Sequence, residues 1–227
     1  MLNIPSPVLR EIYTTGGFHA PNGEYVDLSI AAGIGWGLAE ALYGVVLERR
    51  PKRALEIGMA SGISSLSILS ALAEAGPEGT LVSIDPFQST RHRTAGVNHV
   101  AKAGFASRHR LMEEPDYVAL PRLLDESATF DFVYVDGNHR VESVVLDAFY
   151  ADLLLVPGGV VAFNDCGWRT VHTALKHVPV RARYDEIDVG LKPDYRAKNP
   201  LFSLVRRLTG RSHSDRYFQK KPATPRN

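Results

Sequence analysis

The stretch Glu56-Ile57-Gly58-Met59-Ala60-Ser61-Gly62 decides the fold of this chain. It follows the apolar residues 54–57 and precedes residues 63–75, in which apolar side chains recur at helical spacing. The pattern predicts a short buried strand, a glycine turn and a helix. Glycines let the backbone turn sharply and let a ligand approach the main chain. An open parallel sheet binds its ligand at the carboxyl ends of its strands, so this turn is the first candidate site.

The rest of the chain repeats the alternation of strand and helix. The expected strands are residues 54–57, 80–84, 108–112, 130–135, 160–163, 181–189 and 216–220, and the expected helices are residues 29–49, 63–75, 92–103, 117–124, 141–155, 168–177 and 201–208. This order indicates an α/β fold, a Rossmann-like doubly wound sheet covered on both faces. We expect it to be mostly parallel, with an antiparallel last strand at its edge and an N-terminal cap helix.

The expected organisation is a cap segment (residues 1–50), one domain (51–221) and a disordered tail (222–227). Residues 1–28 are rich in turn formers and predict a loop or short helix lying over the domain. The apolar residues 28–47 hold four glycines and lead straight into the first strand, which favours a buried cap helix over a membrane span.

Composition excludes few functions. The 227 residues are 44% hydrophobic and 22% charged, as in a soluble globular domain, and the net charge is +1. From Lys192 onward, however, ten Lys and Arg face two Asp. Such a basic end is either solvated or meets an anionic substrate, an acidic patch or nucleic acid. The lone Cys166 excludes an internal disulfide, and with no apolar leader at the start we expect a cytoplasmic protein.

The turn at residues 56–62 does not fit a dinucleotide. The fingerprint G-x-G-x-x-G fails because Ala60 and Ile63 stand at its second and third glycine positions. Glu56 would repel a pyrophosphate and suits a ligand with a cationic end. Asp85, at the end of the next strand, is well placed to accept both hydroxyls of a ribose. Together these residues predict a nucleoside that carries positive charge.

The chain resembles the class I S-adenosylmethionine-dependent methyltransferases. Within that class it is similar to the small O-methyltransferases, namely macrocin O-methyltransferase and its relatives and, more distantly, catechol O-methyltransferase. Four motifs in order, over roughly residues 25–178, carry the resemblance: Leu55-Glu56-Ile57-Gly58-x-x-x-Gly62, Ser83-Ile84-Asp85-Pro86, Phe130-Asp131-Phe132-Val133-Tyr134-Val135-Asp136-Gly137-Asn138-His139 and Leu154-Leu155-Val156-Pro157-Gly158-Gly159-Val160.

The resemblance implies S-adenosyl-L-methionine as cofactor and a set of residues that bind it. It implies Glu56, Gly58, Ser61 and Gly62 at the methionine end, Asp85 on the ribose, Glu113 beside the adenine, and Asp136 close to the cofactor. Relatives often have Gly-Asp where this chain has Glu114-Pro115-Asp116, so the adenine position departs from the family pattern.

The resemblance also implies a chemical site at the ends of two strands. Asp136, Asn164 and Asp165 would hold Mg²⁺ or another hard divalent ion, which prefers oxygen ligands. His139, three residues past the first of them, would be the catalytic base. Close relatives often have Glu or His at the position of Asn164. Two alternatives stay open: Asp136 only caps the following helix, and His139 is a satisfied polar residue.

The predicted function is O-methylation of a hydroxyl on a small molecule such as a natural product, a sugar or a phenol. One alternative is an RNA methyltransferase that uses the basic end, but such enzymes commonly carry Asn-Pro-Pro-Tyr where this chain has residues 136–139, Asp-Gly-Asn-His. Another is a non-catalytic cofactor-binding module. Nucleic-acid and membrane partners are not expected, and a homodimer is left open. Trp168 either walls the substrate pocket or simply packs.

Overall fold

The computed structural model describes residues 4–28, 33–177 and 183–222. The chain divides into two compact units, Met1–Ala119 and Leu120–Asn227, and each is described separately. The expected domain boundary between residues 50 and 51 stays a prediction. The expected tail lies outside the described residues, except for its first residue.

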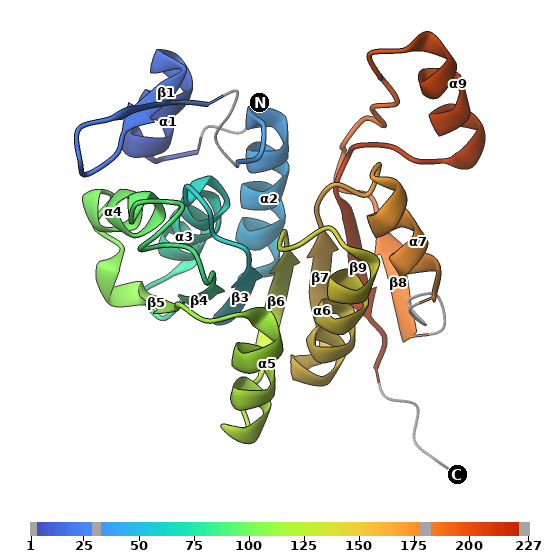
Figure 1. Ribbon diagram of the computed structural model, residues 1–227. Helices are drawn as coiled ribbons and strands as arrows, with labels where there is room; N and C mark the ends of the chain where they lie inside the picture. The colour runs from blue at the N-terminus through green and yellow to red at the C-terminus, as the bar shows by residue number, and fades with distance from the viewer. Residues whose placement is uncertain (1–3, 29–32, 178–182, 223–227) are drawn as a thin grey trace. The chain divides into compact units, whose positions relative to one another are not determined.

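The first unit begins with a small N-terminal subdomain (Figure 1). Ser6 caps α1 (Pro7–Thr15), and the sharp end of that helix leads into a hairpin of β1 (Gly17–His19) and β2 (Tyr25–Asp27). The sequence predicted a loop or a short helix here and missed the hairpin. Its strands are only three residues long, too short for an alternating apolar pattern to show.

The body of the first unit is a parallel sheet in the order β5-β4-β3. Helix α3 packs against both α2 and β4, and nearly all of its residues are buried, which explains why it lacks a polar face. The remaining elements of this unit have these bounds: α2 (Trp36–Arg49), β3 (Arg53–Ile57), α3 (Ile63–Ala75), β4 (Thr80–Ile84), α4 (Ala95–Lys102), the short 3₁₀ helix η1 (Ala106–Arg108) and β5 (His109–Met112). Helix α5 (Asp116–Asp125) spans the point where the chain divides.

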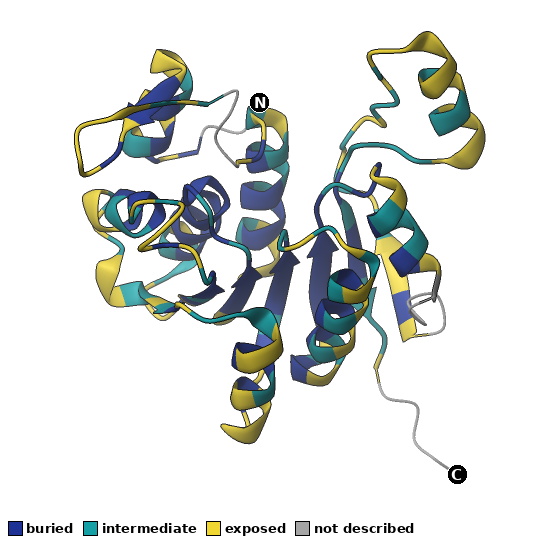
Figure 2. Cartoon of the chain, viewed as in Figure 1, coloured by how far each residue is buried: buried dark blue, intermediate teal, exposed yellow. Residues whose placement is uncertain are grey.

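The second unit holds the strands β6-β7-β9-β8 in that order. Strands β6 and β7 are parallel, and β9 is antiparallel to both β7 and β8. Figure 2 shows that β6 and the second half of β7 are mostly buried, whereas α9 carries exposed residues. The elements have these bounds: β6 (Phe130–Val135), α6 (Val141–Leu154), β7 (Leu155–Phe163), α7 (Arg169–His177), β8 (Tyr184–Ile187), α9 (Pro200–Thr209) and β9 (Arg216–Lys220).

The expected α/β, Rossmann-like fold class is confirmed, including the antiparallel last strand. The expected edge position of that strand is wrong, because β9 lies between β7 and β8 and bonds to both. Strand β7 also begins earlier than expected. Pro157-Gly158-Gly159 precedes the expected strand 160–163 and forms an irregularity within β7, where the register shifts from Phe130↔Leu155 to Phe132↔Val160.

Two helices begin later than expected. Helix α4 begins at Ala95 because Arg93 and Thr94 adopt left-handed backbone angles, which end any helical run before them. Helix α2 begins at Trp36, and part of its expected first turn lies outside the described residues. Within the described residues, no helix is long and apolar enough to cross a membrane.

Candidate functional site

In the first unit, the turn between β3 and α3 has the geometry expected of a ligand-binding loop. Gly58 and Gly62 have φ angles of 92° and 77°, and Ala60 lies at 45°, a conformation that L-residues rarely adopt. The Gly58 N–H donates to Ile84 O at the end of β4, and the Gly62 N–H donates to Met59 O. The turn is therefore fixed at both glycines before any ligand arrives.

Asp85 is the residue that organises this turn. Its side chain is buried, and its Oδ2 accepts hydrogen bonds from the backbone N–H of Met59 (3.2 Å) and of Ala60 (2.6 Å). Its Oδ1 accepts from the Phe87 N–H at 2.8 Å, and Gln88 Nε2 donates to Oδ2 at 3.1 Å. The residue expected on the ribose thus also holds the shape of the glycine turn.

Glu56 faces the core of the first unit. Its side chain is fully buried, and its Oε2 accepts the hydroxyls of Ser65 and Ser83, both at 2.6 Å. Because the Ser83 hydroxyl donates to Glu56, His109 Nε2, 3.0 Å from Ser83 Oγ, must donate to it. Glu56 therefore anchors the end of β3, and its expected contact with the cofactor stays a prediction.

The hydrogen-bonded side chains of Glu56, Ser83 and His109 predict that the protein loses stability in mild acid. Burial lowers the pKa of His109 to about 4, below its ordinary 6.5, so the unfolded chain binds the proton more readily. The free energy of unfolding therefore rises with pH between those values. As the pH falls from 6.5 to about 4, protonation linked to His109 should lower that free energy by about 3 kcal/mol. Urea denaturation at pH 7.5 and 4.5 should show a smaller acid loss in His109→Gln. The matched His19→Gln variant, at an exposed site, should behave like the parent.

Helix α4 closes the far side of the turn. A Cβ on Gly62 would lie 2.9 Å from Gly96 Cα, so the two glycines let the backbones touch. His99 Nδ1 bonds to Ser61 O at 2.8 Å, and the ring of Phe18 from β1 packs edge-on against His99. Gly96 and His99 could not be predicted as part of this site, because neither belongs to a motif and only tertiary packing brings them to the turn.

Glu113, expected beside the adenine, follows β5 and is exposed. Its Oε1 accepts hydrogen bonds from both the N–H and the hydroxyl of Ser89, each at 2.5 Å. Ser89 follows β4, so this contact ties together the loops after two neighbouring strands. Glu113 thus stands at the carboxyl edge of the sheet of the first unit, where a ligand of an open parallel sheet binds.

In the second unit, a histidine lies between two carboxylates. Asp136 follows β6 and Asp165 follows β7, and their side chains are 19% and 31% exposed. His139 Nε2 lies 3.7 Å from Asp136 Oδ1 and 3.6 Å from Asp165 Oδ2. That nitrogen is buried and makes no hydrogen bond within the described residues. The structure therefore brings together three of the side chains expected at the chemical site.

The pKa values of all three side chains in this cluster are raised above their ordinary values. Burial raises the pKa of Asp136 to about 6, although His139 opposes the shift. The Asp136 carboxylate and, less strongly, Asp165 raise the pKa of His139. Burial raises the pKa of Asp165, whereas His139 and His213 lower it. Clustered groups with perturbed pKa values in a partly exposed position are typical of active sites.

Asn164 faces the interior beside this cluster. Its Nδ2 donates to Asp215 Oδ1 at 2.9 Å and to the Tyr134 hydroxyl at 3.3 Å, and that hydroxyl donates to Asp215 Oδ2 at 2.9 Å. Asp215 is buried, and burial raises its pKa well above the ordinary value. Sequence reasoning missed Asp215 because it immediately precedes the last strand, far along the chain from the motifs.

The donors suit a hard divalent ion only in part. Asp136 and Asp165 supply the carboxylate oxygens that such an ion prefers. The amide nitrogen of Asn164, however, is committed to Asp215, and His139 lies between the two acids. Within the described part of the chain, no group of three or more His, Cys, Asp or Glu side chains is arranged to hold a metal ion. A metal at Asp136, Asn164 and Asp165 stays a prediction.

Two further residues, Cys166 and Trp168, lie near this cluster in the chain. Cys166 is buried, its thiol donates to Phe163 O, and burial raises its pKa, so it is a packing residue rather than a nucleophile. Trp168, which was expected either to wall a pocket or to pack, is half exposed and lies with its ring 5.0 Å from that of His139. It also lines a cavity. The pocket-wall alternative is therefore the one that the structure favours.

Comparison with known proteins gives the class of this fold. Residues 55–166 match a family described as a methyltransferase domain. An O-methyltransferase from Bacillus cereus in complex with S-adenosylhomocysteine superimposes with a TM-score of 0.69 at 13% identity, over 95% of this chain and 90% of that one. The O-methyltransferase TomG from Streptomyces achromogenes, in complex with S-adenosylmethionine, gives 0.69 at 19% identity, over 98% and 93%.

The curated relatives agree with this class. A probable caffeoyl-CoA O-methyltransferase from Dictyostelium discoideum is 30% identical over 50% of this chain and 47% of its own length. A putative O-methyltransferase from a Mycobacterium species is 32% identical over 59% and 60%. The chain thus spans about half the length of the curated relatives it matches. These similarities confirm the Rossmann-like methyltransferase fold and the expected resemblance to S-adenosylmethionine-dependent O-methyltransferases.

Proposed function

We propose that this chain is an S-adenosylmethionine-dependent O-methyltransferase that acts on a hydroxyl group of a small molecule. The observation that carries the proposal is the imidazole of His139 between the carboxylates of Asp136 and Asp165. The similarity to O-methyltransferases, two of them in complex with S-adenosylmethionine or its product, supports it. A scaffold that only binds the cofactor has no need of clustered titratable groups.

The first unit supplies the residues proposed to bind the cofactor. Gly58, Ser61 and Gly62 form the turn, and Asp85 offers its carboxylate to the ribose hydroxyls. Because Asp85 already accepts two backbone N–H groups of the turn, it holds the turn and the ribose together. Bound there, S-adenosylmethionine supplies an electrophilic methyl group on a sulfonium sulfur. Glu56 and Glu113 are proposed to flank its methionine and adenine ends.

His139 is the proposed general base. A free alcohol or phenol is largely protonated at neutral pH, so the attacking oxygen needs a proton acceptor. His139 Nε2 would take that proton, so that the oxygen could attack the methyl group that bound S-adenosylmethionine would supply, with the neutral sulfide as leaving group. Asp136 and Asp165 stabilise the resulting imidazolium, since both carboxylates lie within 4 Å of Nε2. The proton then leaves to solvent from His139.

We further propose that a divalent cation such as Mg²⁺ assists. Asp136 and Asp165 would hold it through their carboxylates, with the oxygen of Asn164 as the third ligand. When bound, such an ion lowers the pKa of a substrate hydroxyl. The ion would act on the substrate hydroxyl, whereas His139 accepts its proton. The metal is therefore a separate element of the proposal, and it is tested separately.

The test is methyl transfer from tritiated S-adenosylmethionine to a panel of catechols, phenols and sugars, with and without EDTA. We expect labelled ether products, loss of activity in EDTA and its return with Mg²⁺ or Mn²⁺. Asp165→Ala should abolish the metal-dependent turnover and leave S-adenosylhomocysteine affinity within about threefold, because Asp165 is a proposed metal ligand and is not among the residues proposed to bind the cofactor.

The controls distinguish the proposed role of the metal from the proposed methyl transfer itself. Asp185→Ala, at an exposed acid of the same unit, should keep full activity and metal dependence. Full activity in EDTA would remove the metal from the mechanism and leave His139 as the base. Transfer to no member of the panel, despite cofactor binding, would contradict the proposed reaction.

A further inference from the structure

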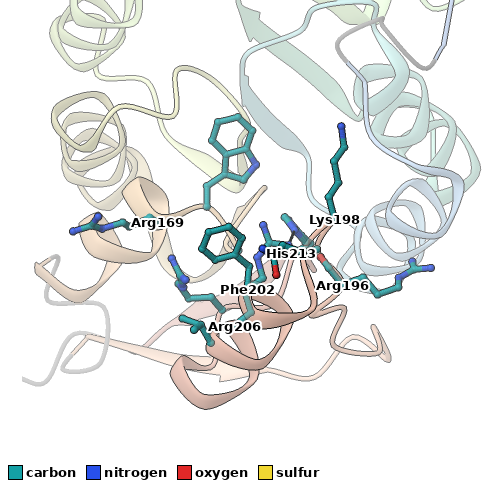
Figure 3. A pocket seen from close by; sticks show the side chains of 12 residues that line it. Arg169, Arg196, Lys198, Phe202, Arg206 and His213 are labelled. Carbon is teal, nitrogen blue, oxygen red and sulfur yellow. Dashed lines mark hydrogen bonds between the residues drawn. The ribbon is translucent and has the colours of Figure 1, made fainter.

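The second unit contains a cavity that the sequence did not reveal. It has a volume of about 820 Å³ and lies among the residues before α7, the segment before α9, α9 itself and the segment after it. Figure 3 shows that its labelled side chains come from separate stretches of chain that the fold brings together. The residues that matter for its chemistry are Trp168, Arg196, Lys198, Phe202, Arg206 and His213.

The lining of this cavity is strongly cationic. It contains four arginines and one lysine, and within the described chain it contains no acidic residue. Asp194, outside the lining, neutralises Arg196 through two hydrogen bonds of 2.8 and 2.9 Å. Arg206 contacts the Arg196 carbonyl and His213 Nε2, which hold it in place, and within the described residues it forms no ion pair with a carboxylate. Lys198 makes no ion pair within the described residues and is exposed.

The same cavity offers aromatic surface. Trp168 and Phe202 are 50% and 58% exposed, so both rings present apolar surface that a ligand could cover. In Figure 3, Phe202 lies at the centre of the cavity close to Arg206 and His213, and Lys198 extends along one side. Flat apolar rings beside fixed cations suit a planar ligand that carries a negative charge.

The cavity adjoins the proposed base. Trp168 contributes to its wall and lies against the ring of His139. His213, also in the lining, is near enough to Asp165 for its charge to lower the pKa of that carboxyl. A ligand seated between Trp168 and Phe202 would therefore lie beside the cluster that is proposed to take the proton.

We propose that this cavity binds the methyl acceptor and that the acceptor is a hydroxylated aromatic compound bearing an oxyanion, either a carboxylate or a phosphate. This inference rests on the proposed function and adds the substrate class to it. The ring lies between Trp168 and Phe202, and Lys198 and Arg206 hold the oxyanion. This placement also assigns a role to part of the basic excess after Lys192.

The test compares acceptors that differ only in charge. Calorimetry on the full chain saturated with S-adenosylhomocysteine would measure 3,4-dihydroxybenzoate, its neutral amide and the matching aryl phosphonate. At least one anion should bind roughly tenfold more tightly than the amide, because a charged hydrogen bond is lost in the amide. The tighter of the two anions identifies the natural group.

Three variants separate charge from stacking. Lys198→Gln should remove most of the preference for the anion. Phe202→Ala should weaken the binding of the acid and of the amide to the same extent. Arg207→Gln, at an exposed position of α9 outside the cavity lining, should change neither. Equal affinity for all three probes, absent binding of all three, or a preference that survives Lys198→Gln would overturn the inference.

A failure of the proposed substrate class can be distinguished from a failure of the proposed methyl transfer. Methyl transfer is measured separately with the same three compounds and labelled S-adenosylmethionine. Lys198-dependent binding of an anion without transfer would leave the cavity as an anion site and contradict the proposed reaction. Transfer that is equally efficient for the acid and the amide would support the reaction and overturn the substrate class.

Discussion

Replacing His139 with alanine is expected to lower kcat by about 10²–10⁴-fold, the usual contribution of a general base. The imidazole lies within 4 Å of both Asp136 and Asp165, so its loss removes the proton acceptor and leaves two carboxylates facing each other. S-adenosylhomocysteine affinity should stay within about threefold, because His139 is not among the residues proposed to bind the cofactor. Single-turnover kinetics with a catechol acceptor would measure the effect on the chemical step.

A matched control is available on α7. His172 belongs to the same unit, and its Nε2 makes no hydrogen bond within the described residues. His172→Ala should therefore keep the parent kcat. A His139→Ala enzyme with undiminished kcat would contradict the assignment of His139 as base. An equal loss in both variants would indicate a general disturbance of the second unit rather than a chemical role.

Replacing Asp85 with asparagine is expected to weaken S-adenosylhomocysteine binding by on the order of 1–3 kcal/mol, about 5- to 150-fold. The carboxylate has two tasks, and the substitution affects both. It removes a charged partner from the ribose, and it weakens the acceptor for the N–H groups of Met59 and Ala60. Calorimetry should show micromolar affinity for the parent protein and little binding of NAD, since the G-x-G-x-x-G pattern is absent.

The two tasks of Asp85 can be separated by measuring the melting temperature without ligand. A lower melting temperature reports the loosened turn, whereas the further loss of affinity reports the ribose contact. Asp125→Asn, the same change at an exposed carboxylate, should alter neither quantity. Unchanged affinity in Asp85→Asn would rule out the ribose role.

The elements that the sequence alone determined are those with strong local signals. The helix Ile63–Ala75 and the strands Thr80–Ile84, Phe130–Val135 and Arg216–Lys220 have the predicted bounds. Each is an apolar or β-branched run between turn-forming or polar residues, so its limits depend on neighbours in the chain. The predicted turn at Gly58 and Gly62 followed from the same local logic, because backbone angles of this kind favour glycine.

The predicted neighbours Asp136, His139 and Asp165 also followed from order along the chain. The carboxyl ends of parallel strands share one edge of a sheet, so residues that follow β6 and β7 must lie close together. The sequence could not show that His139 Nε2 would lie between the two acids, nor that Asn164 would turn toward Asp215. Those details depend on side-chain packing and on a residue more than fifty positions away.

Only the tertiary structure decided the order of the last strands and the character of the cavity. Strand β9 lies between β7 and β8 because its backbone bonds to both, and no local pattern distinguishes an edge strand from its inner neighbour. The sequence left open whether the basic residues after Lys192 form a solvated end or meet an anionic substrate, an acidic patch or nucleic acid. Folding brings Lys198, Phe202 and Arg206 beside Trp168, thirty or more positions earlier in the chain. Contacts between residues so far apart arise from packing, which sequence periodicity does not encode.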